Sequence, residues 1–128
     1  MTVVMSSRWR RLLSLSLILA GTAIAVASLY PNLQLPGVGE GFDLVFHGGA
    51  YGTLVILGAK LRYRLRWVGV AVLLYATLLE GLQYFVPARE VHLSDLAANV
   101  VGILAGLAIV ALWHRHSSAV REPDDKVR

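Results

Sequence analysis

A glutamate, Glu80, lies inside the apolar run Trp67–Val86, which is otherwise typical of a membrane span. A carboxyl group at such depth is costly in hydrocarbon, so it usually faces protein or water and indicates a functional site. Two kinds of chemistry are open to it: hydrogen bonding to a bound polar group, or proton transfer as a general acid or base. Any function of the chain is therefore expected around Glu80.

Six further polar residues fall near the same membrane end of their own segments. Several of them are three or four residues apart, which places them on one face of a helix. Together with the glutamate they make up the candidate binding residues: Asp43, His47, Glu80, Gln83, Arg89, Asp95 and Asn99.

The depths of these residues indicate a single site. Glu80 lies seven residues before Pro87, or about 10 Å along a helix axis. The histidine and the asparagine lie about 6 Å inside the two aspartates at the same rise per residue. We therefore expect Glu80 at the floor of the site, with Asp43, Arg89 and Asp95 at its rim.

Composition excludes several classes of protein. Of the 128 residues, 56% are hydrophobic and 16% are charged, whereas an average soluble domain carries about 25% charged residues. We expect a multi-pass protein of the cell membrane, surrounded by the lipid bilayer. The net charge of +4 does not indicate nucleic-acid binding, because the basic residues flank apolar runs and form no groove-lining face. The absence of cysteine excludes thiol chemistry, and no motif predicts a metal ion or another cofactor.

Four apolar segments of 16 to 20 residues predict an all-α fold, a four-helix transmembrane bundle. About 20 helical residues cross the hydrocarbon core of a membrane. Residues 1–11 then form an N-terminal tail, residues 12–113 the membrane domain, and the polar residues 114–128 a disordered C-terminal tail. The predicted spans are Leu12–Leu29, Leu44–Ala59, Trp67–Val86 and Leu96–Trp113.

The first span has a second interpretation, a cleaved signal peptide. Arginines precede it, and Ala25-Val26-Ala27 resembles the small-residue cleavage site of such peptides. Its 18 apolar residues exceed the usual core of about 7–15, which favours an uncleaved anchor.

Basic residues predict the orientation of the bundle. Eleven of the twelve lysines and arginines lie in the N-terminal tail, in the loop between the second and third spans, or in the C-terminal tail. Since Lys and Arg concentrate on the cytoplasmic side, both termini are expected in the cytoplasm. The segments Tyr30–Asp43 and Pro87–Asp95 then face outward.

Two glycines in the fourth span predict a close helix contact. Gly102 and Gly106 continue the helical face of Asn99, and small residues four apart let another helix approach closely. We expect this face to point into the bundle.

The candidate residues also have ordinary structural interpretations. A buried set of acid, amide and arginine side chains can serve only as polar contacts between helices. Asp95, or its neighbour Ser94, can be the N-cap of the fourth helix. His47 can be a metal ligand, although no spacing such as His-x-x-x-His supports a metal site.

The ordered set of these residues resembles the VanZ-like family of small bacterial integral membrane proteins. The family often has Lys, Phe and Gly where this chain has Leu44, Gly48 and Ala88. The resemblance implies a protein of the bacterial cell envelope. Because the family is named after a member linked to reduced sensitivity to the glycopeptide teicoplanin, it also implies a link to antibiotic resistance. The matching pattern is Asp43-x-x-x-His47-x-x-x-Tyr51, Glu80-x-x-Gln83, Pro87-Ala88-Arg89 and Asp95-x-x-x-Asn99-x-x-Gly102-x-x-x-Gly106.

Three functions are compatible with these observations. The first is a non-enzymatic protein whose outward-facing pocket binds the head group of a lipid or of a lipid-linked cell-wall precursor, or a glycopeptide. The second is an intramembrane enzyme acting on a lipid-linked substrate, with Glu80 or His47 as general acid or base. The third is a structural bundle that uses Gly102 and Gly106 against another protein. The absence of a nucleophile motif or a phosphate-binding loop favours the first over the second.

Overall fold

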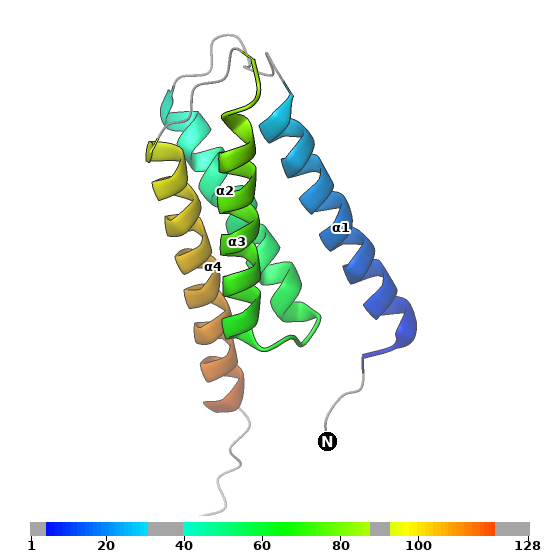
Figure 1. Ribbon diagram of the computed structural model, residues 1–128. Coiled ribbons are helices and arrows are strands. Elements are labelled where there is room, and N and C mark those ends of the chain that lie inside the picture. The colour runs from blue at the N-terminus through cyan, green and yellow to red at the C-terminus, as the bar shows by residue number, and fades with distance from the viewer. Residues whose placement is uncertain (1–4, 31–39, 88–92, 120–128) are drawn as a thin grey trace, which may run out of the picture.

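The computed structural model describes residues 5–30, 40–87 and 93–119 and consists of four helices (Figure 1). Helix makes up 89% of these residues, and none of them is in a strand. The prediction of an all-α four-helix fold is therefore confirmed. The helices are α1 (Ser7–Leu29), α2 (Glu40–Lys60), α3 (Leu65–Gln83) and α4 (Leu93–Ala119).

α2 and α3 lie at the centre of the bundle, where each packs against the other three helices, while α1 and α4 make no contact with each other. In Figure 1, the start of α1, the connection from α2 to α3 and the end of α4 all lie at the same end of the molecule. We call this the basic end, because the described basic residues gather there, and the opposite one the far end. These basic residues are Arg8, Arg10, Arg11, Lys60, Arg62, Arg64, Arg66 and Arg115.

Three of the helices, α1, α3 and α4, are long and apolar enough to cross a membrane. α2 is about as long, roughly 32 Å for its 21 residues at 1.5 Å per residue, and it contains His47 and several glycines. Because α2 packs against the three other helices, part of its surface faces protein and need not be apolar.

The third helix ends three residues before its predicted end at Val86. α3 stops at Gln83, and the N–H groups of Phe85 and Val86 donate to the carbonyls of Leu82 and Gln83 in tight turns. A residue that precedes proline is disfavoured in helical conformation, so Pro87 acts on the residue before it as well as on itself.

All four helices begin before their predicted apolar runs, and α2 and α4 also end beyond theirs. α1 begins at Ser7, since the Ser6 side chain caps it by accepting from the Trp9 N–H. α4 continues to Ala119, so the predicted disorder of the C-terminal tail is wrong for residues 114–119, and residues 120–128 lie outside the described ones. A helix extends at low cost once formed, and basic side chains near its C-terminus interact favourably with its dipole.

The closest contact in the bundle joins α2 to α4 through glycine. Gly48 and Gly52 of α2 face Gly102 and Gly106 of α4, so the two backbones touch. A Cβ atom at Gly106 would lie 2.9 Å from the carbonyl oxygen of Gly52. The glycine face of α4 thus packs directly against α2 of the same chain.

The apolar core is built mainly from α2 and α3. Leucine, isoleucine and valine side chains of α1 remain widely exposed, as expected for a helix that faces lipid, and only Ser28 of α1 is buried. The buried apolar cluster consists of Tyr51, Leu54, Val55, Val68, Val72, Ala76 and Ile103.

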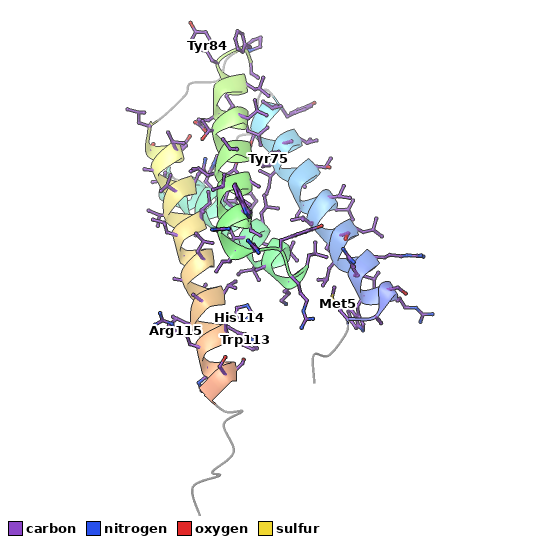
Figure 2. All side chains as sticks on the ribbon, turned by 60° about the horizontal axis from the view of Figure 1, so that its bottom comes forward. Met5, Tyr75, Tyr84, Trp113, His114 and Arg115 are labelled. Carbon is purple, nitrogen blue, oxygen red and sulfur yellow. The ribbon has the colours of Figure 1, made fainter. Side chains whose placement is uncertain are left out.

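A hydrogen bond joins α3 to α1. The Tyr75 hydroxyl donates to the Gly21 carbonyl oxygen at 2.6 Å, and Tyr75 lies on the side of α3 toward α1 (Figure 2). We expect Tyr75→Phe to lower the free energy of unfolding by about 0.6 kcal/mol, the average for such bonds within a membrane protein. Reversible unfolding of the purified protein in mixed detergent measures this, with Tyr63→Phe, at an exposed position, as the control. Equal stabilities of the two variants would show that the bond contributes nothing.

Candidate functional site

Three of the predicted site residues have buried polar side chains. Glu80 is 6% exposed, Gln83 is 2% exposed, and Asn99 is completely buried. Glu80 and Gln83 are one helical turn apart near the far end of α3, and Asn99 lies two turns into α4 from the same end. None of the three faces lipid, so α3 and α4 turn their hydrophilic positions into the bundle.

The glycine contact sets the level of α2 against α4. A Cβ atom at Gly48 would lie 3.2 Å from the carbonyl oxygen of Ala98. His47 and Asn99, the chain neighbours of these two residues, are therefore at the same depth in the bundle. The side chain of His47 is half-buried.

Tyr51 and Ser28 extend the site to the remaining helix. Tyr51 is 2% exposed and lies one turn from His47 on α2. Its hydroxyl is within hydrogen-bonding reach of Ser28 on α1 and within electrostatic range of Glu80 on α3. All four helices thus contribute to what we call the polar layer: Ser28, His47, Tyr51, Glu80, Gln83 and Asn99.

Ser28 is the member that sequence reasoning missed. It is the sole buried residue of α1, while the serines nearer the start of that helix are exposed or half-buried. Its one signal in the sequence is its place near the far end of the first apolar run, at the depth of the other polar residues. Serine is common in membrane helices, so this signal does not separate it from its neighbours.

The predicted rim is described only in part. Arg89 lies outside the described residues, and Asp43 is placed in α2 by its backbone alone. Asp95 is half-buried in the first turn of α4, and the Ser94 hydroxyl donates to its Oδ1 at 3.4 Å. Because α4 begins at Leu93, neither Ser94 nor Asp95 is its N-cap, and that interpretation was wrong. A carboxylate in the first turn still interacts favourably with the helix dipole.

Asn99 has an exceptional environment. Neither its Oδ1 nor its Nδ2 atom has a hydrogen-bond partner among the described residues. Leaving a buried polar group unpaired costs about 1–3 kcal/mol, so buried amides almost always bond to protein or to ordered water. The carboxamide can donate two hydrogen bonds and accept two. The hydrogen-bonding capacity of this carboxamide is therefore unused within the described residues.

Two hollows in the surface of the described residues lie away from the polar layer. One, of about 220 Å³, is a groove between α3 and α4, and the other, of about 460 Å³, lies beside Arg10 and Arg11 of α1. Within the described ranges, no three His, Cys, Asp or Glu side chains gather in a way that could hold a metal ion. The chemistry that the described layer offers is directed hydrogen bonding by an acid, amides and hydroxyls.

Comparison with known proteins places this arrangement in context. Among protein families, VanZ/LLP1 matches the chain over residues 2–114, which includes all four helices up to the last turns of α4. No curated protein and no solved structure matches it.

Proposed function

The chain belongs to the VanZ/LLP1 family, and on that premise we propose that it is a non-enzymatic protein of the bacterial cell envelope that binds a polar head group in its polar layer. The ligand is the head group of a lipid or of a lipid-linked cell-wall precursor. The proposal includes a link to glycopeptide sensitivity, because the family is named after a member linked to teicoplanin. The basic end lies in the cytoplasm and the far end faces outward, as the excess of Lys and Arg favours.

The unpaired carboxamide of Asn99 is the observation that carries this proposal. It is fully buried, with both polar atoms unpaired among the described residues, and it lies at the depth of His47. A bundle held together only by polar contacts would use this amide between its helices, since an unsatisfied polar group within a membrane is costly. A bound head group, with phosphate or sugar oxygens, would supply the missing partners.

Each residue has a role in the proposed complex. Glu80 and Gln83 accept and donate hydrogen bonds at the floor, and Asn99 orients the ligand from α4. Arg89 pairs with an anionic group of the ligand at the rim, since a guanidinium forms two parallel hydrogen bonds with a phosphate or carboxylate.

An intramembrane enzyme is the second candidate. Glu80 and His47 are the groups that could transfer protons. The polar layer contains no cysteine or lysine, and among the described residues no three His, Cys, Asp or Glu side chains gather as a metal site, although Ser28 and Tyr51 carry hydroxyls. Binding requires only hydrogen-bonding groups, whereas catalysis also requires a nucleophile or a positioned proton-transfer group. We therefore favour binding without turnover.

Asn99→Leu tests the proposal. Leucine has as many heavy side-chain atoms as asparagine but no polar ones, and its methyl groups are larger than the amide atoms. We expect stability to stay within about 1 kcal/mol of the parent chain, because removal of an unpaired amide offsets the tighter packing. Binding should weaken about tenfold, as for the loss of a buried hydrogen bond to a charged group. The measurement is the shift in melting temperature of the full chain in nanodiscs as a lipid-linked cell-wall precursor is added, since a ligand that binds only the folded state raises it.

Thr53→Val is the control for Asn99→Leu. Thr53 is an exposed residue of α2 whose hydroxyl bonds to the Gly49 carbonyl of its own helix. This variant should bind like the parent chain. If Asn99→Leu destabilises the protein strongly, the amide is a structural contact, and if it binds the precursor normally, the ligand does not use it. Growth of bacteria carrying either variant in the presence of teicoplanin then tests the proposed link to glycopeptides.

A further inference from the structure

The groove between α3 and α4 is apolar along its length and basic at one end. The residues that line the groove are spaced three or four apart along each helix, so each helix forms one wall. Val70, Leu73 and Leu104 are partly exposed in it. The lining consists of Arg66, Gly69, Val70 and Leu73 of α3, and Val100, Ile103, Leu104 and Leu107 of α4.

Gly69 explains why a groove forms here. It has no side chain, and a Cβ atom at this position would lie 3.2 Å from Cδ1 of Leu107. The leucine therefore covers the glycine, and the surface is hollowed beside it. By contrast, α4 meets α2 with the two backbones in contact.

Arg66 is the sole charged residue of the lining. It is exposed at the start of α3, and its guanidinium carbon lies 5.7 Å from the centre of the Trp67 ring. No acidic residue lines the groove, and Arg62 and Arg64 are exposed in the connection just before α3. Trp113 and Arg115 also lie at the basic end (Figure 2). From Arg66 the α3 wall runs seven residues to Leu73, or about 10 Å into the membrane.

We propose that this groove binds an anionic phospholipid of the leaflet at the basic end, with one acyl chain between α3 and α4 and the phosphate on Arg66. The occupant follows from chemical complementarity. An acyl chain matches apolar walls that open toward lipid, and a guanidinium at the mouth matches a phosphate. Basic side chains near a membrane surface favour anionic over zwitterionic lipids. This site is independent of the polar layer, which lies toward the far end.

The test uses lipids with brominated acyl chains, which quench tryptophan fluorescence on contact. Trp9→Phe and Trp113→Phe leave Trp67, beside Arg66, as the one tryptophan of the full chain. In nanodiscs, brominated phosphatidylglycerol should reach half-maximal quenching at a mole fraction about fivefold lower than brominated phosphatidylcholine. Equal mole fractions for the two lipids would overturn the proposal.

Variants on this background separate a site from general attraction by charge. Arg66→Gln should remove the preference and Arg66→Lys should keep part of it, whereas Arg64→Gln, outside the groove, should retain it. Val70→Phe fills the groove and should also remove the preference, with Leu74→Phe, an exposed residue of α3 outside the groove, as its control. Equal losses in Arg64→Gln and Arg66→Gln, or a preference unchanged in Val70→Phe, would overturn the proposal. Circular dichroism establishes that each variant is folded.

Discussion

Gly102→Ala is expected to disrupt the bundle, with a loss of about 3 kcal/mol or more in the free energy of unfolding. A methyl group on Gly102 would overlap the carbonyl oxygen of Gly48 and lie 2.6 Å from its Cα atom. Both neighbours are backbone atoms, which cannot rotate away as a flexible side chain does. α2 and α4 would therefore separate, and the level of His47 against Asn99 would be lost. Reversible unfolding in mixed detergent, together with abundance in the membrane, measures the effect.

Gly49→Ala is the matched control for this substitution. Gly49 is in α2 beside Gly48, but a Cβ atom there has nothing within 4 Å. Alanine favours helix over glycine by about 1 kcal/mol, so this variant should be as stable as the parent chain or more stable. If Gly102→Ala and Gly49→Ala are equally stable, the α2–α4 contact is not as close as described here.

Glu80→Leu is expected to bind the lipid-linked precursor at least about tenfold more weakly than Glu80→Gln. This is the effect of losing buried hydrogen bonds to a charged group of the ligand. Glutamine has nearly the shape of glutamate and still forms hydrogen bonds. The affinity of Glu80→Gln should therefore lie within about threefold of that of the parent chain, a smaller change than the loss of one such hydrogen bond would cause. Leucine offers no polar atom at the floor of the polar layer and should abolish binding. Titration of the lipid-linked precursor into nanodiscs measures both constants.

The pair also tests whether Glu80 transfers protons in the candidate enzyme. A residue that transfers protons cannot be replaced by glutamine, so an enzyme that uses Glu80 in this way would lose all turnover in Glu80→Gln. Thr77→Val is the control on the same helix, since Thr77 is exposed and its hydroxyl bonds to the Leu73 carbonyl. Loss of binding in Glu80→Gln, with normal abundance, would count against a role limited to hydrogen bonding.

The helices and the depth of the polar residues could be predicted because both depend on local sequence. Apolar runs of about 20 residues form helices in a membrane, where each backbone group must be satisfied within its own segment. Helical spacing then placed Glu80 with Gln83 on one face. Helix ends were less certain, as α3 and α4 show, since they depend on Pro87 at one end and on helix extension into water at the other.

The partner of each helix face could not be predicted, because α4 is apolar nearly all round and its hydrophobicity does not distinguish a protein-facing side from a lipid-facing one. Gly102 and Gly106 indicated a close contact but not with which helix. The tertiary structure shows that they contact Gly48 and Gly52 of α2. Two helix backbones can meet only where both helices lack side chains at the same depth. The sequence alone thus determined that a polar region exists in a membrane bundle and how deep it lies. Only the packing of the four helices decided that Ser28 is buried in this polar region and that the amide of Asn99 has no hydrogen-bond partner among the described residues. The physical reason is that burial and hydrogen bonding depend on neighbours that are distant in the chain.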